Sequence, residues 1–277
     1  GSEMCIRDSG NTAVQTSADV QPMQTHYAFT CGDVDLKVTF TAPLFMEDLK
    51  LLSRPVNYLT YSVAARDGKE HEVEVYFEAS PRWALDQPYQ QSASKGYEAD
   101  GLLYLKSGSK EQNILAKQGD DLRIDWGYFY MVAGKENTAY SVGNSTELRK
   151  NFVNGTLNSA SLEGEDSNGN MALVRSYGKV KNVTDKSILG YDDIYSIQYF
   201  GTNLRPYWNS KGDRTIEAEM LAAYNEYDKL LVRCYAFDKK LMEDASAAGG
   251  KEYAELCALA YRQSIAAHKL VEAPNGD

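Results

Sequence analysis

The sequence is poor in the residue types on which most metal-binding motifs depend. It has only three histidines and four cysteines among its 277 residues. The histidines, at His26, His71 and His268, lie far apart, and the absence of an HExxH pair excludes a zincin-type site. The cysteines show no CxxC spacing, which excludes both a zinc ribbon and a regular disulfide framework. The sequence therefore predicts no metal site and no cofactor.

Phosphate-binding and serine-hydrolase motifs are absent as well. Gly134-Lys135 and Gly250-Lys251 lack both the upstream glycine and the following Ser or Thr of a phosphate loop. No GxSxG sequence is present, and the two SxxK sequences, at Ser92 and Ser107, have no companion SDN or KTG motif. We interpret the two SxxK matches as chance.

Long apolar runs and an excess of basic residues are also missing. No stretch is long and apolar enough to predict a transmembrane helix. The formal net charge of -10 argues against a nucleic acid or an anionic membrane as partner, because both would repel an acidic surface. What remains is a composition that is ordinary for a globular protein.

The C-terminal part predicts two long helices separated by Gly249-Gly250. Residues 215–247 are amphipathic, and the apolar side chains that share one face are Met220, Tyr224, Tyr227, Leu231, Cys234 and Phe237. Residues 251–271 are apolar on nearly all sides, which is typical of a helix buried on most of its surface. We expect an outer helix followed by an inner helix that exposes apolar side chains in this chain. Because two helices cannot surround the inner one, the sequence predicts a piece of a longer protein.

Residues 26–200 show mainly strand patterns. Apolar residues alternate with polar ones in residues 33–41 and 71–78, and the positions expected to be buried are Val34, Leu36, Val38, Phe40, Val73, Val75 and Phe77. Asp67-Gly68, between the strand patterns of residues 56–64 and 71–78, predicts a tight hairpin. Many short strands with turn signals between them predict an antiparallel β-sandwich.

Composition divides the chain into three parts. Residues 1–10 have no periodicity and do not join naturally to the segment after them, so we interpret them as an added or wrongly assembled segment. We expect residues 1–23 to be unstructured, residues 24–203 to form the sandwich, and residues 204–277 to hold a linker and the first helices. The predicted fold class is thus mainly β with a C-terminal α part.

One polar cluster on the predicted inner helix is a candidate site. Its members are Tyr261, Arg262, Gln263 and His268. Burying Arg and Gln is costly unless they are paired or face a cavity. Two interpretations therefore stand: Arg262 pairs with a carboxylate and locks the helix pair, or part of the cluster lines a substrate pocket. Asp192-Asp193 are similarly ambiguous, since they could flank a site or merely solvate a strand.

Several long segments resemble one known family. Residues 48–61 (DLKLLSRPVNYLTY), 75–83 (VYFEASPRW) and 193–208 (DIYSIQYFGTNLRPYW) resemble the N-terminal β-domain of the glutaminase A family of secreted fungal and bacterial enzymes. Residues 236–277 look like the start of that family's helical domain. The resemblance runs from about residue 24 to the end of the chain.

The resemblance implies a β-supersandwich followed by an (α/α)6 toroid, of which this chain would hold the first helical hairpin. It also implies that the full-length parent hydrolyses L-glutamine to L-glutamate and ammonia, that the β-domain supports the helical catalytic domain, and that this chain alone is inactive. It implies a secreted, periplasmic or cell-surface location. No catalytic motif of the family maps onto these positions, so the catalytic residues stay unassigned.

Two alternatives from other classes remain open. The chain could be part of a six-hairpin-type glycoside hydrolase, or a purely structural or interaction sandwich. Fold resemblance alone does not choose between chemistries. Assays of the full-length parent with glutamine and with a panel of glycosides separate the two enzymes.

Overall fold

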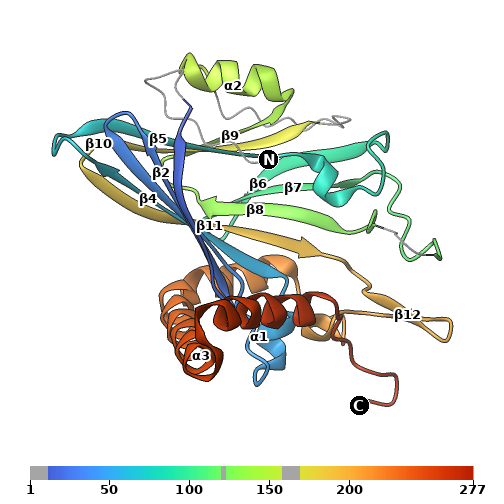
Figure 1. The fold of residues 1–277 in the computed structure, drawn as a ribbon. Coiled ribbons are helices and arrows are strands. Elements are labelled where there is room, and N and C mark those ends of the chain that lie inside the picture. Colours follow the sequence, from blue (N-terminus) through green and yellow to red (C-terminus); the bar gives the residue numbers. More distant parts are fainter. Residues whose placement is uncertain (1–11, 120–122, 158–168, 277) are drawn as a thin grey trace.

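The fold is a stack of two β-sheets with helices on both outer sides. The computed structural model describes residues 12–119, 123–157 and 169–276. Figure 1 shows the short helix α2 on top, the two sheets in the middle, and α1 and α3 below. The large sheet is fully antiparallel and has the strand order β1-β2-β3-β4-β11-β8-β7-β6, and the small sheet has the order β5-β10-β9. The mainly antiparallel β architecture predicted from the sequence is confirmed.

Most strands are short, as the turn signals predict. The strands of the large sheet are β1 (Val14–Val20), β2 (Gln24–Cys31), β3 (Val34–Thr41), β4 (Val56–Ala65), β6 (Ser92–Ala99), β7 (Leu102–Ser109), β8 (Tyr128–Gly134) and β11 (Asn182–Asp192). The small sheet consists of β5 (His71–Ala79), β9 (Thr138–Gly143) and β10 (Asn170–Val180). A separate two-stranded hairpin consists of β12 (Ile197–Tyr199) and β13 (Thr202–Leu204). The helices are α1 (Leu49–Ser53), α2 (Ser145–Val153) and α3 (Ile216–Ala266), with short 3-10 turns η1 (Pro81–Ala84) and η2 (Tyr207–Asn209).

Three apolar layers hold the stack together. The first lies between the two sheets, the second between the large sheet and α3, and the third under α2. Strand β4 shows how one segment serves two layers: Leu59 joins the first layer and Tyr58 the second, and each is 1% exposed. Successive side chains of a strand point to opposite faces, so the middle of the large sheet is buried on both.

Helix α3 is two helices joined at a glycine, as the sequence predicts. Gly250 has φ 84° and ψ -175°, which breaks the helix inside the range Ile216–Ala266. The first half packs on the large sheet through the side chains of Met220, Tyr227 and Cys234, all 9% exposed or less. The second half is mostly exposed, and it presents the apolar surface that the sequence predicts, with Leu256 at 61% exposure. Among the described helices, none combines the length and apolar character that crossing a bilayer requires.

The predicted strand register is confirmed. Val34, Leu36 and Val38 are buried on the inner face of β3, and Phe40 is half-buried beside them. Val73, Val75 and Phe77 of β5 are buried in the same layer from the opposite sheet.

The hairpin predicted at Asp67-Gly68 is wrong. Strand β4 pairs with β3 and β11, whereas β5 pairs with β10 in the other sheet. The turn at Gly68, which has φ 72°, thus carries the chain from one sheet to the other. A positive φ marks a sharp turn, but long-range pairing decides which strands become partners.

The expectation of an unstructured segment up to residue 23 is also wrong in part. Residues Val14–Val20 form β1, an edge strand paired with β2. Nearly every side chain of β1 is exposed, so the strand carries no apolar alternation that sequence analysis could detect. The predicted added segment at residues 1–10 lies outside the described residues.

Candidate functional site

A cavity of about 830 Å³ lies where the C-terminal end of α3 meets the end of the large sheet. Its walls come from α1, the segment after β11, η2 and residues 264–270. Apolar wall residues include Met46, Leu49, Leu52, Pro55, Ile124, Tyr191, Trp208 and Ile265. The polar residues are Ser53, Arg54, Asn57, Asp193, Ser196, Ser264, His268 and Lys269. Apolar walls with a few polar groups are typical of small-molecule sites.

Asp193 is the most deeply buried charge of this cavity. It is 4% exposed, and its Oδ2 accepts hydrogen bonds from Ser196 Oγ at 2.6 Å and from Lys269 Nζ at 3.1 Å. The lysine comes from the tail after α3, which is held by a hydrogen bond from the Tyr207 N–H to the Leu270 carbonyl at 2.9 Å. Burial of the carboxylate is tolerable because both partners satisfy it. The sequence left open whether Asp193 flanks a site or solvates a strand, and the structure places it in the cavity wall.

Arg54 is another charged residue of the cavity wall. Its Nε lies 3.2 Å from Glu219 Oε2 and its Nη1 lies 2.9 Å from Glu226 Oε2. Glu219 also accepts from Arg214 at 2.5 Å, within the first turn of α3. These ion pairs fix the start of α3 against α1, so the guanidinium is a structural charge in the wall.

Two of the four predicted site residues, Tyr261 and Arg262, lie outside the 830 Å³ cavity. Tyr261 lines a second cavity of about 960 Å³, which is lined by residues of both halves of α3. The Tyr261 hydroxyl donates to the Leu44 carbonyl, and its ring lies 5.1 Å from the Phe237 ring centroid. Arg262 Nη1 donates to Thr25 Oγ1 at 2.7 Å. Both therefore tie the second half of α3 to the body of the protein. One of our interpretations had Arg262 paired with a carboxylate within the helix pair, whereas its hydrogen bond goes to a hydroxyl on β2.

The other two predicted site residues, Gln263 and His268, do not make such contacts with the body of the protein, as far as the structure describes it. Gln263 is exposed and lines neither of the two cavities next to α3. His268 is also exposed. It lines the 830 Å³ cavity and contacts the Ser264 carbonyl through Nδ1. The structure thus brings only His268 to the cavity. Lys269, its neighbour, gave no sequence signal because a lone lysine near a chain end is ordinary.

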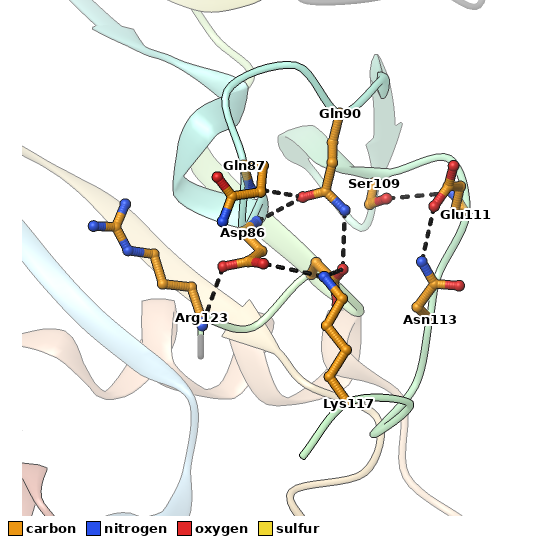
Figure 2. A network of polar contacts seen from close by, with 9 residues as sticks. Asp86, Gln87, Gln90, Ser109, Glu111, Asn113, Lys117 and Arg123 are labelled. Carbon is orange, nitrogen blue, oxygen red and sulfur yellow. Dashed lines mark hydrogen bonds and ion pairs between the residues drawn. The ribbon is translucent and has the colours of Figure 1, made fainter. Parts of the chain in front are cut away.

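A second polar cluster includes Asp125, which follows the cavity residue Ile124 in the sequence, and Figure 2 shows contacts of this cluster. Lys117 Nζ lies 3.1 Å from Asp86 Oδ2 and 3.2 Å from Asp125 Oδ2. Asp86 is 7% exposed and Asp125 is 1% exposed. Gln90 Nε2 donates to Asp125 Oδ2 at 2.9 Å, and Gln90 Oε1 accepts from the Asp86 N–H. Sequence analysis missed the cluster because its members lie on loops up to 39 positions apart, from Asp86 to Asp125 (125 − 86).

The Lys117 ammonium sets the charge state of this cluster. Its hydrogen bond with Asp86 lowers the pKa of that carboxyl, and the same contact raises the pKa of Lys117. The lysine thus favours the ionised form of Asp86 and also contacts the buried Asp125 carboxylate. The cluster pins the loop after η1 to the segment that precedes β8, next to the wall residue Ile124.

A third group of charges lies on the α3 side of the large sheet. Lys106 Nζ sits 3.7 Å from the ring centroid of Tyr128, and Tyr97 donates to Glu217 Oε1 at 2.6 Å. Burial, followed by the charge of Lys95, lowers the pKa of Lys106. An ammonium over an aromatic face is stabilised without a carboxylate.

The cavity has the size and lining of a small-molecule site, but its described residues do not assemble a hydrolytic centre. Its carboxylate, Asp193, is already neutralised by Lys269, and His268 has its Nδ1 at a carbonyl. In the described ranges, no group of three or more His, Cys, Asp or Glu side chains is placed to hold a metal ion. Among the described residues, Cys31, Cys234 and Cys257 are free thiols.

Comparison with known proteins gives two relationships of different strength. The sequence pattern of a family described as "Domain of unknown function (DUF5127)" matches residues 23–244. Glutaminase A of Aspergillus oryzae (strain ATCC 42149 / RIB 40) is 27% identical over 281 residues, which cover 95% of this chain and 40% of that protein. The identity supports a glutaminase A-like relationship, and the chain spans about 40% of the length of this relative.

Solved structures give no closer guide. The heparan sulfate lyase HepC of Pedobacter heparinus and a mutant of it match 68% of this chain and 23% of theirs. The mutant has 5% sequence identity and a TM-score of 0.34, and the other structure has 6% identity and a TM-score of 0.28. These values are too low to support an argument about fold or chemistry. The family pattern, in contrast, covers the sandwich and the first half of α3, and the chain therefore belongs to the DUF5127 family.

Proposed function

We propose that this protein is the supporting β-rich part of a glutaminase-like hydrolase. The reaction is the hydrolysis of L-glutamine to L-glutamate and ammonia, carried out by the whole polypeptide that its gene encodes. One observation carries the proposal: 27% identity to Glutaminase A extends over 95% of this chain. An identity spread over so much of the chain favours a shared architecture over a single shared motif.

The contacts of α3 support a scaffolding role. The first half of the helix lies on the large sheet through an apolar layer and through the Arg54–Glu219 ion pair. The second half is held by Arg262 and Tyr261 and leaves Leu256 and Leu259 exposed. This geometry fits a sandwich that holds the first helical hairpin of an (α/α)6 toroid, with the sandwich acting as its platform.

The proposal includes that the 277-residue chain is inactive alone. Catalysis requires reacting groups held in a defined geometry around the substrate. In the described residues, the charged groups Asp193 and Arg54 of the cavity are already paired, and the chain spans 40% of its curated relative. We place the missing groups in the rest of the polypeptide.

We also propose a secreted, periplasmic or cell-surface location, on the family resemblance. Fractionation of the native host, with detection of the polypeptide by antibody, tests this. Detection only in the cytoplasmic fraction contradicts it.

The function is tested by ammonia release from L-glutamine. The 277-residue chain and the whole polypeptide of the gene are assayed in parallel, with heat-inactivated samples as controls. Activity of the whole polypeptide and none of the chain supports the proposal. Activity of the chain alone refutes the supporting role, and cleavage of a glycoside by a whole polypeptide that leaves glutamine intact refutes the glutaminase assignment.

A further inference from the structure

Two hairpin turns of this protein have similar backbone conformations, but one has a polar residue and the other an aromatic residue at the first central position. The β6–β7 turn has Asp100 at φ 49° and Gly101 at φ 79°, and the β12–β13 turn has Phe200 at φ 45° and Gly201 at φ 81°. Turns with positive φ at both central residues prefer Asn, Asp or Gly, as the first turn has. A bulky aromatic residue at positive φ is an outlier that costs stability. The geometry of the turn therefore does not explain why Phe200 is there.

Burial does not explain Phe200 either. Its side chain is 91% exposed and that of its neighbour Tyr199 is 49% exposed. The two rings contact each other edge to face, with centroids 4.6 Å apart. The tip of this hairpin, defined here as Tyr199 and Phe200, thus presents a preformed aromatic surface to the outside. Figure 1 shows the hairpin projecting away from the body of the protein.

The foot of the hairpin is held firmly, although an isolated two-stranded hairpin is marginally stable in water. The Ser196 N–H donates to the Leu204 carbonyl at 2.8 Å, and Trp126 Nε1 donates to the Tyr195 carbonyl at 2.9 Å. The Arg205 guanidinium lies 4.7 Å from the ring centroid of Tyr195. A strained and exposed tip on an anchored stem is the arrangement of a contact site, because the scaffold sustains the strain that the contact needs.

The C-terminal tail lies at this same foot. Val271 forms an antiparallel bridge with Pro206, which comes two positions after the last residue of β13. Residues 272–276 therefore continue from the foot of the hairpin. The match to Glutaminase A covers only 40% of that protein, so such a relative has room for a large further segment.

We propose that Tyr199 and Phe200 form a docking tip that inserts into an apolar pocket of the segment following residue 277 in the same polypeptide. The proposal rests on the part of the proposed function that places this chain in a longer protein, but not on the reaction. Aromatic side chains suit this role because they bury a large area with few rotatable bonds. A second copy of this chain, or an unrelated protein, is an alternative occupant that accessibility and sedimentation measurements identify.

The first test uses the opposite effects of one substitution in two proteins. In the 277-residue chain, Phe200→Gly relieves the positive φ and we expect the melting temperature to rise by about 1–3 °C. In the whole polypeptide the same change removes the docking side chain, and we expect a lower melting temperature. Asp100→Gly is the matched control, because it changes an equivalent turn without an aromatic group, and should act alike in both proteins. A rise of similar size in both proteins overturns the proposal.

The second test measures accessibility directly by hydroxyl-radical oxidation and mass spectrometry. Tyr199 and Phe200 should oxidise readily in the 277-residue chain and at least several-fold more slowly in the whole polypeptide. Tyr89, which is 81% exposed in a separate loop, serves as the internal reference. Equal oxidation in both proteins overturns the proposal, as does a dimer of the 277-residue chain that Phe200→Gly dissociates in sedimentation. Ammonia release is recorded separately. If Tyr199 and Phe200 are protected from oxidation in a whole polypeptide without glutaminase activity, only the proposed reaction is refuted.

Discussion

The backbone N–H of Met23 donates a hydrogen bond to Asp238 Oδ1 at 2.7 Å and so joins the start of β2 to the first half of α3. Met23 is fully buried and Asp238 is 3% exposed. The other carboxyl oxygen, Oδ2, is buried without a hydrogen-bond partner in the described residues. Burial raises the pKa of Asp238 to about 6, against the hydrogen bonds of the Met23 and Gln24 backbone and the charge of Arg262, and the charge of Asp19 adds to the rise.

We predict that the contribution of Asp238 to the free energy of unfolding falls as pH rises. The folded-state pKa of about 6 lies above the ordinary 3.8, so the folded protein binds more protons than the unfolded chain between these values. The contribution is fully present below pH 3.8 and is lost as pH passes about 6. The whole effect is at most about 3 kcal/mol. Asp238→Asn keeps an acceptor for Met23 and should remove this fall, as measured by urea unfolding at several pH values.

The control for this experiment is Asp228→Asn, an exposed position on the same helix. It should leave the pH profile of the free energy of unfolding unchanged. A wild-type profile that stays flat across the interval, or one that Asp238→Asn does not alter, contradicts the prediction.

For the cluster of Figure 2 we predict the opposite pH dependence of stability. Lys117→Met leaves Asp86 and Asp125 as two buried carboxylates without their shared cation. We expect a lower free energy of unfolding at pH 7, because unpaired buried charges are costly. The Lys117 contact lowers the pKa of Asp86 below 3.8, so its contribution is present above 3.8 and lost as pH falls further. The difference between variant and wild type, measured by denaturant unfolding, should therefore shrink in acid.

Lys179→Met is the matched control for this cluster, since Lys179 is exposed on β10. It should change the free energy of unfolding by less than about 0.5 kcal/mol. Equal effects of the two lysine substitutions mean that the cluster contributes nothing specific.

Gly190 is a point of close approach between the large sheet and α3. A Cβ at this position would lie 2.3 Å from Met220 Cε and 2.7 Å from the Pro55 carbonyl oxygen. The methionine can move, but the backbone carbonyl cannot, so Gly190→Ala should cost about 1–3 kcal/mol through overpacking. Gly143→Ala, whose nearest atom is 3.8 Å away, is the control in the same denaturant titrations. A tolerated Gly190→Ala shows that α3 can shift on the sheet.

The exposed apolar side chains of the second half of α3 predict aggregation of this chain. Leu256 is 61% exposed and Leu259 is 44% exposed. Replacing both by Gln should lower the binding of a hydrophobic dye and raise solubility, with the melting temperature nearly unchanged, because little burial is lost. Ala258→Gln, at a fully buried position one residue away, should instead lower the melting temperature. Unchanged dye binding by the double variant means that the patch lies elsewhere.

The packing of α3 on the large sheet means that shortening the chain cannot test this apolar patch by itself. Its first half covers Tyr58 and Tyr130 of the large sheet, so a chain shortened to end near Trp208 would expose that face. Point substitutions in the second half are therefore the informative experiment.

Local chemistry determined much of this protein from sequence alone. Alternation of side chains fixed the inner face of β3 at Val34, Leu36 and Val38, and the Gly249-Gly250 pair marked the break in α3. These features depend on residues close together in the chain, where periodicity and the freedom of glycine act directly. The absence of motif residues for a metal or a nucleotide was likewise readable from the sequence.

Long-range contacts decided the rest. No local pattern near Asp67-Gly68 indicates that β5 pairs with β10 and not with β4, because the burial of whole sheet faces determines which strands pair. The cavity unites Arg54, Asp193 and Lys269, which lie on three separate segments, and only the docking of the tail on η2 brings them together. The sequence allowed Arg262 to line a pocket or to pair with a carboxylate, yet the packing of α3 placed it against Thr25. Sequence determined which side chains could be buried, and tertiary packing determined what each of them meets.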